Sequence, residues 1–185
     1  MNNNTEESIQ DVLYSRKVID MLTVSNEYCL FMETAEDRKK EEIFQYVQKL
    51  LPLIYLKASL LPDIPVNDED AAEHFVTEEQ WENLFNTLVI KLKDDDTYYY
   101  IDLNEKSHSD PARASLSENL TDIYQDLKDF VLLYHKPYRS SQENAVRDCK
   151  TLFETRFGYR LVNAMQAIHN ILFPPVDTGN YSDLG

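Results

Sequence analysis

Glycine is nearly absent from this chain, and its scarcity limits the folds that the chain can adopt. The whole sequence of 185 residues has three glycines, Gly158, Gly179 and Gly185. Antiparallel sandwiches and barrels use glycine in tight hairpins, and nucleotide-binding folds use it in the loop that holds phosphate. Leucine, glutamate, glutamine and lysine, which favour helices, are abundant instead. We therefore expect an all-α fold, a compact bundle of about five principal helices joined by polar loops.

The length and the apolar content of the chain fit one domain. Hydrophobic residues make up 43% of the sequence and aromatic residues 11%, which is enough for a real core. No internal repeat or long linker divides the chain. We expect a single helical domain over residues 1–185, with an ordered core from about residue 7 to about residue 173. The N-terminal residues and the tail, 174–185, are expected to fray.

The formal net charge of -15 excludes some partners and favours others. A strongly acidic surface repels the phosphate backbone, so we expect no nucleic-acid binding. Anionic membrane surfaces are disfavoured for the same reason. Another protein, with a basic surface, is the partner that this charge would suit, although solubility alone also accounts for it. The oligomeric state is not fixed by these numbers.

Cysteine usage and the start of the chain suggest a cytoplasmic location. Cys29 and Cys149 are too few for a disulfide framework and fit reduced core residues. The residues Met1–Glu7 contain neither a basic region nor an apolar region of the secretory kind. The most apolar stretch, Leu50–Leu61, is too short to span a bilayer.

The first half of the chain contains two stretches with apolar residues at helical spacing. One begins with a helix-start signal at Asn4–Glu7 and runs to about Glu33. It is apolar on two faces, so we expect it to lie centrally in the bundle. The other covers roughly Asp37–Leu61, and Pro52, which lacks an N–H donor, predicts a kink or a restart there. The acidic segment Asp63–Val76 is expected to be a loop.

Capping-box patterns open the remaining helices. Such a box pairs a serine or threonine with a glutamate or glutamine three residues later, just before an apolar run. The pattern occurs at the start of each of three stretches, Thr77–Leu92, Ser115–Pro137 and Ser140–Leu172. The middle stretch has the cleanest amphipathic pattern in the sequence.

The segment Thr97–Leu103 (TYYYIDL) has the composition of a strand rather than of a helix. A lone strand cannot form a sheet, and we find no partner for it in the neighbouring Ser107–Ala114, which reads as a loop. We therefore expect residues 97–103 to form a short extended connection laid over the core. A helical turn is the alternative.

Motifs for common enzyme chemistry and for metal or cofactor binding are absent from the sequence. No serine lies between glycines, as a nucleophile elbow would require. None of the four histidines has a histidine or cysteine at ligand spacing. The acidic runs Asn67–Asp70 and Asp94–Asp96 lack the glycine and the final glutamate of a calcium loop. We expect no cofactor, no metal and no catalytic residue of a recognisable kind, and the balance leans away from an enzyme.

One group of charged residues does stand out on the last two long helices. In helical projection Arg156 and Arg160 fall within the apolar sector of the final helix, where a buried charge needs an anionic partner. The preceding helix offers a row of acidic residues at four- and three-residue steps, of which Asp129 points most toward water. The candidates for a polar network or a ligand site are Arg156, Arg160, Asp122, Asp126, Glu118, Asn26 and Glu27.

Three interpretations of this cluster remain open. It can be a buried ion-pair network that ties the bundle together, a polar pocket for an anion or a partner's carboxylate, or a catalytic site. Gly158 lies between the two arginines, in a helix interior where glycine is unfavourable by about 1 kcal/mol relative to alanine. We expect another backbone or a bulky ring, such as Trp81 or a tyrosine, to pass close to it.

Four segments of the sequence together carry a resemblance to a known family. They are Val24–Cys29, Leu53–Lys57, Ser117–Phe130 and Phe157–Ala164 with His169. With these segments the chain, from about Val12 to Leu172, resembles a family of small bacterial proteins catalogued only as a domain of unknown function. Where that family usually has a tryptophan before the glycine of the last motif, this chain has Phe157. The resemblance implies a compact helical domain and no activity, cofactor or catalytic residue.

Two hypotheses of function follow from the sequence. The first is a cytosolic, non-enzymatic protein-interaction module. The second is a small-ligand domain, anion-binding or catalytic, that uses an arginine and carboxylate pocket between the last two long helices and the first helix. An open cleft beside the two arginines would favour the second hypothesis, and a closed, fully paired network would count against it.

Overall fold

A computed structural model of the chain describes residues 12–101 and 111–174. Its long helices are α2 (Arg16–Glu33), α3 (Lys40–Ser59), α4 (Glu78–Leu92), α5 (Leu116–Tyr134), α6 (Arg139–Leu152) and α7 (Gly158–Leu172). The π-helical turn η4 (Phe153–Phe157) joins α6 to α7 without a break. Counted this way, the described residues form five helical stretches, and the predicted mostly helical fold is confirmed.

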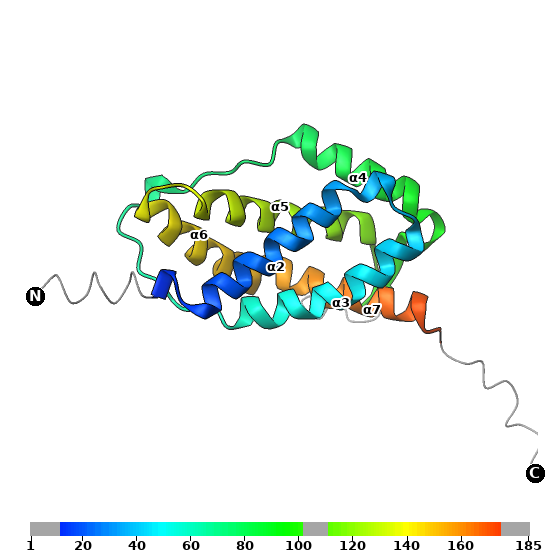
Figure 1. Cartoon of the computed structure of the whole chain (residues 1–185). Coiled ribbons are helices and arrows are strands. Elements are labelled where there is room, and N and C mark those ends of the chain that lie inside the picture. Colours follow the sequence, from blue (N-terminus) through cyan, green and yellow to red (C-terminus); the bar gives the residue numbers. More distant parts are fainter. Residues whose placement is uncertain (1–11, 102–110, 175–185) are drawn as a thin grey trace, which may run out of the picture.

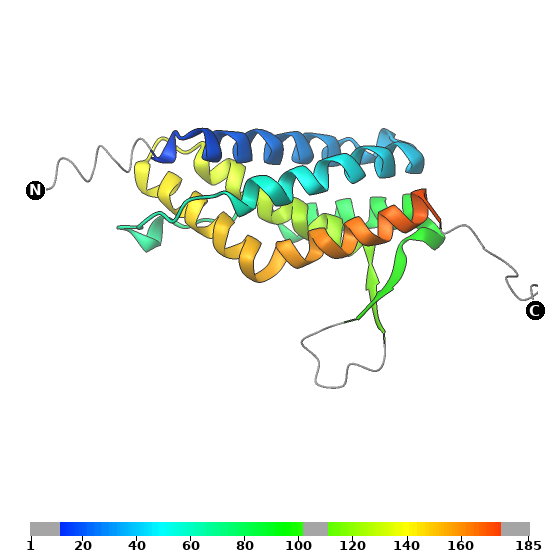
Figure 2. The ribbon, with the colours of Figure 1, turned by 90° about the horizontal axis from the view of Figure 1, so that it is seen from below.

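Helix α5 is the centre of the bundle. It packs against α2, α4, α6 and α7, and buried residues occur around most of its circumference. In Figure 1, α2 crosses in front of α5, with α4 above it and α3 below it, next to α7. Figure 2 shows α2 and α3 as one layer and the stretch from α6 to α7 as the opposite layer. The central place expected for the first helix was therefore wrong, since α2 packs mainly on α3 and α5 and leaves Ile19 and Leu30 exposed.

The helix boundaries in the first half differ from the prediction in two respects. The start signal at Asn4–Glu7 lies outside the described residues, as do the predicted frayed ends before residue 12 and after residue 174. Helix α2 begins at Arg16, after a turn at Ser15. Helix α3 runs through Pro52 without a restart, because this proline lies on the exposed face, where water can hydrate the carbonyl that it leaves unpaired.

The capping predictions are confirmed at two of the three helix starts. The Thr77 side chain accepts from the Gln80 amide and Gln80 reciprocates, which completes a capping box at α4. Ser115 Oγ accepts from the Glu118 amide at the start of α5. The third prediction was wrong, since α6 begins at Arg139, one residue before Ser140, with Tyr138 as its N-cap. Glu143 is buried there and accepts from Arg139 instead.

The extended segment that the sequence predicted has a partner. Strand β1 (Thr97–Tyr100) pairs antiparallel with β2 (Ala112–Ser115), with Thr97 opposite Ser115 and Tyr100 opposite Ala112. The expectation of an unpaired connection was therefore wrong within the described residues, and positions 102 and 103 lie outside them. Strand β2 escaped notice because alanine, arginine and serine carry no β-propensity signal. The hairpin projects from one side of the bundle beside α7 (Figure 2).

Both cysteines lie in the core, as expected. Cys29 and Cys149 are free and buried, and burial raises the pKa of the Cys29 thiol to about 12. No helix among residues 12–101 and 111–174 is long and apolar enough to cross a membrane.

Candidate functional site

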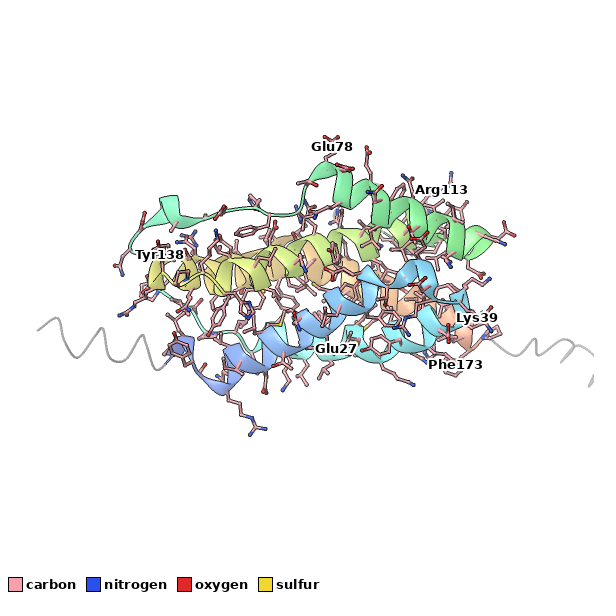
Figure 3. The ribbon with its side chains drawn as sticks, turned by 45° about the horizontal axis from the view of Figure 1, so that its top comes forward. Glu27, Lys39, Glu78, Arg113, Tyr138 and Phe173 are labelled. Carbon is pink, nitrogen blue, oxygen red and sulfur yellow. The ribbon has the colours of Figure 1, made fainter. Side chains whose placement is uncertain are left out.

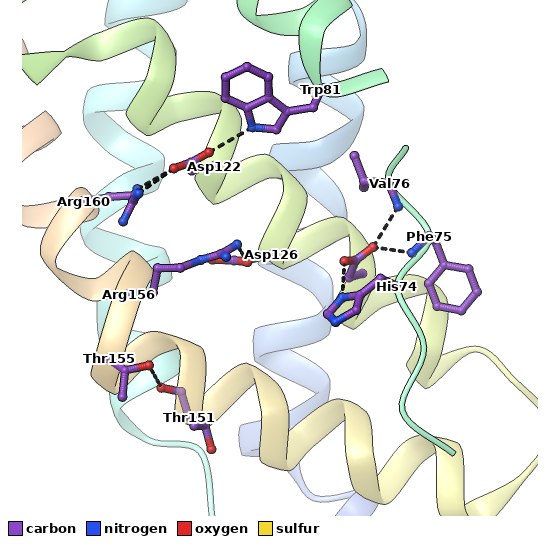
Figure 4. Close-up of polar contacts among 11 residues, drawn as sticks. His74, Phe75, Val76, Trp81, Asp122, Asp126, Thr151, Thr155, Arg156 and Arg160 are labelled. Atoms are coloured by element: carbon purple, nitrogen blue, oxygen red, sulfur yellow. Dashed lines mark hydrogen bonds and ion pairs between the residues drawn. The ribbon is translucent and has the colours of Figure 1, made fainter. Parts of the chain in front are cut away.

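Two arginine–aspartate pairs link the final helical stretch to α5. Arg156, in the π-helical turn, makes a two-pronged contact with Asp126, in which Nε donates to Oδ2 at 2.9 Å and Nη2 donates to Oδ1. Arg160, one turn further on, donates from Nε to Asp122 Oδ2 at 2.8 Å, and its Nη2 lies 2.6 Å from the same oxygen. Figure 4 shows both arginines reaching toward α5. The structure thus brings four of the seven candidate residues together.

The two pairs differ in burial. The Asp126 side chain is 3% exposed, whereas Arg156 is 40% exposed. Burial raises the pKa of the Asp126 carboxyl, although the hydrogen bonds and the charge of Arg156 act to lower it. Asp122 is 15% exposed and Arg160 31%. In each pair the carboxylate lies deeper than the guanidinium, so the arginine heads face the surface.

Trp81 is a member of this network that the sequence did not place there. Its indole Nε1 donates to Asp122 Oδ1 at 2.9 Å, so this carboxylate binds groups from both α4 and α7 (Figure 4). No spacing rule links a tryptophan on α4 to an aspartate 41 positions later, because the contact depends on how the two helices pack. Asp122 is therefore a junction among three helices.

The other three candidate residues do not belong to the cluster. Glu118 is exposed, and the bond it does make uses its backbone N–H, in the cap of α5. Asn26 and Glu27 are exposed on α2, where Figure 3 labels Glu27. Glu27 accepts from the Tyr46 hydroxyl on α3. The placement of Asn26 in a buried stripe was wrong, because the buried face of α2 carries its neighbour Ser25.

Asp129 was expected to point toward water, and this expectation was also wrong. Its carboxylate is buried and accepts from the backbone N–H groups of Phe75 at 2.8 Å and Val76 at 3.0 Å. His74 Nδ1 lies 2.9 Å from its second oxygen (Figure 4). The segment before α4 covers this side of α5, so Asp129 anchors that segment rather than meeting solvent.

The π-helical turn explains Gly158. The Gly158 N–H bonds to the Phe153 carbonyl five residues earlier, and a Cβ atom at Gly158 would lie 2.4 Å from that carbonyl oxygen. The Phe153 ring would lie 3.2 Å from the same Cβ. A bulky ring does pass close, as predicted, but it belongs to the same helical stretch and not to Trp81 or a tyrosine. The extra residue in this turn also rotates the buried face of α7 relative to that of α6.

A hollow of about 650 Å³ opens beside the two arginines. Arg156 and Arg160 line it, and so do Glu154 and Asn163. Aromatic residues from four elements also line it, namely Tyr55 of α3, Tyr100 of β1, Phe153 of η4 and Tyr159 of α7. The sequence showed no signal for this lining, because its tyrosines come together only when α3, β1 and α7 pack side by side.

A second hollow, of about 270 Å³, continues along the same two elements. The first hollow uses residues 158–163 of α7 with Tyr100 and Ile101, and the second uses residues 166–171 with Thr97, Tyr98 and Tyr99. The two hollows follow one another along α7 and, in the opposite order, along β1. We name the pair the β1–α7 groove.

The groove offers hydrogen-bond donors and aromatic surface. Within the described part of the chain, no group of three or more histidine, cysteine, aspartate or glutamate side chains is placed to hold a metal ion. The lining residues include hydroxyl groups of tyrosine and threonine, but none of them has a histidine partner to activate it. Recognition by hydrogen bonding and ring packing is the chemistry that this arrangement favours.

The fold and the site define a mostly helical domain with a small hairpin, in which ion pairs hold two arginines that line an open groove. The chain belongs to the family described as a domain of unknown function, DUF5063, whose model matches residues 12–174. It is similar to the crystal structure of protein BF1032 from Bacteroides fragilis, at 34% sequence identity and a TM-score of 0.78. That match covers 89% of this chain and 97% of the other. No curated protein matches the chain. The family resemblance noted in the sequence is thereby confirmed.

Proposed function

We propose that this domain is a non-enzymatic protein-interaction module of the cytoplasm, and that it binds a segment of another protein in the β1–α7 groove. The observation that carries the proposal is the pair of arginines that line the groove. Arg156 and Arg160 are each held by a carboxylate through Nε and Nη2, and neither Nη1 has a hydrogen-bond partner among the described residues. The arginines thus present fixed, unused donors to the groove.

The unused N–H donors of an arginine whose charge is already balanced by a carboxylate suit a peptide carbonyl better than a free anion. Asp126 and Asp122 already balance the two positive charges, and Glu154 lines the same hollow. A phosphate or sulfate ion would therefore meet a site with no net positive charge. A carbonyl oxygen requires only the donor, because it carries no full charge to be balanced.

The walls of the groove suit an apolar or aromatic side chain. Tyr159 and Ile101 line the groove and are largely exposed, and the rings of Tyr55 and Phe153, which also line it, meet edge to face. Aromatic rings that bury a partner's side chain commonly supply most of the energy at a protein interface. A segment with one bulky apolar residue would cover these rings while its backbone meets the arginines.

The charge of the whole chain favours a basic partner. The net charge of -15 attracts a positively charged segment over distances of about 10 Å at moderate salt. Buried, reduced Cys29 and Cys149 are the observation behind the proposed cytoplasmic location.

Small-anion binding, or catalysis, at Arg156, Arg160, Asp122 and Asp126 is the second candidate function. The partial exposure of both guanidiniums favours it. The matched carboxylates weigh against it, as does the lack of an activated nucleophile among the described groove residues.

Selection of peptides on the purified protein tests the proposal. A random heptapeptide display library is panned against the wild-type chain, and the affinities of enriched peptides are measured by calorimetry. Tyr159→Ala should weaken binding by about 1–2 kcal/mol, the cost of losing one interface aromatic. Tyr138→Ala is the matched control, because Tyr138 is 68% exposed and Tyr159 is 62% exposed. Tyr138 lies at the end of the bundle opposite Phe173 (Figure 3).

Two results would overturn the proposal. One is a failure to enrich any peptide that binds wild type more tightly than it binds Tyr159→Ala. The other is a rise in melting temperature with sulfate or phosphate that Arg160→Ala abolishes, which would favour the small-anion alternative instead.

A further inference from the structure

The hydrogen-bond pattern of the hairpin leaves one edge of β1 unpaired by any described residue. The Leu116 N–H donates to the Asp96 carbonyl at 2.8 Å, directly before the paired residues. Hydrogen-bonded pairs alternate along an antiparallel ladder, so the next such pairs are Tyr98 with Ala114 and Tyr100 with Ala112. The backbone N–H and C=O groups of Thr97 and Tyr99 therefore point away from β2.

This free edge faces the β1–α7 groove. Both hollows are lined by residues of α7 and of the segment 97–101, and neither is lined by a described residue of β2. The edge also lacks the features that usually block strand addition, since the segment Thr97–Tyr100 contains no charged residue and no proline. A row of backbone donors and acceptors is thus open to a strand from outside.

We propose that the free edge of β1 binds an extended segment of a basic partner protein as a third strand. This inference rests on the proposed function and specifies how the bound segment is held. Residues 154–171, which line the helix side of the groove, extend over roughly 25 Å at about 1.5 Å per residue. A strand of about seven residues spans that length. Its backbone bonds to Thr97 and Tyr99, and its outward groups face the arginines.

Charge decides what the ends of this segment carry. Asp95 is paired with Lys40 at 2.6 Å, while Asp94 in the second hollow and Glu154 in the first join no ion pair among the described residues. With both arginines matched by carboxylates, each hollow keeps an acidic group. The segment therefore carries lysine or arginine near both ends and apolar residues between them. A second copy of this chain would bring a further charge of -15 and is disfavoured.

A proline substitution at Tyr99 separates the backbone from the side chain. Tyr99→Pro and Tyr99→Ala both remove the ring, but only proline removes the N–H that points into the groove. The bonds to β2 use Tyr98 and Tyr100, so the hairpin is retained in both variants. Peptides selected on wild type as above are the probe. Tyr99→Pro should bind them at least about fivefold more weakly than Tyr99→Ala, because a partner carbonyl loses its donor.

A second measurement uses unmodified protein. Amide hydrogen exchange at Tyr99 should slow by about tenfold or more when a saturating peptide is bound, while exchange at Tyr98 and Tyr100 stays slow throughout. Enriched peptides should also carry basic residues near both ends.

The outcomes separate the two proposals. If no selected peptide depends on Tyr159, the proposed function fails and this inference fails with it. If binding depends on Tyr159, but Tyr99→Pro equals Tyr99→Ala and the Tyr99 amide is not protected, the module binds its partner without strand addition and this inference alone is overturned. Dimerisation of the chain that Tyr99→Pro abolishes would show that a second copy occupies the edge, which also overturns it.

Discussion

Replacing Arg156 by alanine removes the one side chain among the described residues that hydrogen-bonds to the buried Asp126 carboxylate. Asp126 is 3% exposed, and both of its hydrogen bonds come from Arg156. Breaking a buried ion pair by removing one partner costs about 3–5 kcal/mol, because the remaining charge is left uncompensated. We expect Arg156→Ala to destabilise the protein by about that amount at neutral pH.

Arg160→Ala is the matched comparison. The exposed fractions of the two arginine side chains are similar, 40% for Arg156 and 31% for Arg160, so the packing lost is alike. Asp122 is less buried, however, and keeps its hydrogen bond from Trp81 Nε1 at 2.9 Å. Arg160→Ala therefore removes one charged hydrogen-bonding partner from Asp122, which should lower stability by about 1.5–3 kcal/mol. The structure thus predicts that Arg156→Ala is the more damaging of two otherwise similar substitutions.

The effect of Arg156→Ala depends on pH in a stated direction. Burial raises the pKa of Asp126 already in the wild type, and the variant loses the hydrogen bonds and charge of Arg156, which lower it. The folded variant therefore binds this proton more tightly than the unfolded chain does, and its stability rises as the pH falls through the folded pKa. The difference in the free energy of unfolding between wild type and Arg156→Ala should therefore become smaller as the pH is lowered from neutral to about 4, the ordinary pKa of aspartate.

Urea unfolding followed by circular dichroism at several pH values measures these differences. The double variant Arg156→Ala, Asp126→Asn should be more stable than Arg156→Ala alone at neutral pH, since no buried charge remains. If Arg156→Ala costs no more than Arg160→Ala, and if the gap to wild type is constant with pH, then Asp126 is not an uncompensated buried charge in the variant and the reasoning fails.

Three further predictions concern the turn, the anchored loop and the thiols. Gly158→Ala should lower stability by about 1–3 kcal/mol in thermal unfolding, because the new Cβ meets the Phe153 carbonyl at 2.4 Å. Replacing an ordinary helical glycine by alanine would raise stability instead. Asp129→Ala leaves two backbone N–H groups without an acceptor and should cost about 2–4 kcal/mol, with faster amide exchange at Phe75 and Val76 than in a Glu118→Ala control. Cys29 and Cys149 should react with a thiol reagent in urea but not in the native state, and prompt native labelling would contradict their burial.

The helices that could be predicted from the sequence are those whose signals are local. The Thr77 and Ser115 caps depend on residues three positions apart, and both helices begin where those residues predict. Strand β2 could not be predicted, because it owes its form to pairing with β1, 12 to 18 positions earlier, rather than to its own composition. The exposure of Pro52 could not be predicted for a similar reason, since it depends on which face of α3 packs against the bundle.

Asp129 shows that the burial of a single carboxylate cannot be predicted from the sequence of its own helix. Its helical position suggested an exposed side chain, and nothing in the sequence of α5 reports that the segment containing Phe75 and Val76 lies over it. The donors are backbone N–H groups, which every non-proline residue carries, so no residue type identifies them. Contacts of this kind become visible only when the chain path is known.

The two arginine–aspartate pairs could be predicted for a different reason. Arg156 and Arg160 were selected because both fall in the apolar sector of the final helix, and the structure shows that their spacing also matches that of their partners. The two arginines are one turn apart, and Asp122 and Asp126 are one turn apart on α5. A rotation of the final helical stretch moves both arginines together, and a rotation of α5 moves both aspartates together. The π-helical turn that rotates α7 therefore leaves the match of spacings intact. Asn26 and Glu27 were included on orientation alone, without a matched spacing on a second helix, and a rotation of α2 by part of a turn reverses such an orientation. Matched spacings on two helices are therefore the stronger guide to a buried network, and the direction of one isolated side chain is the weaker one.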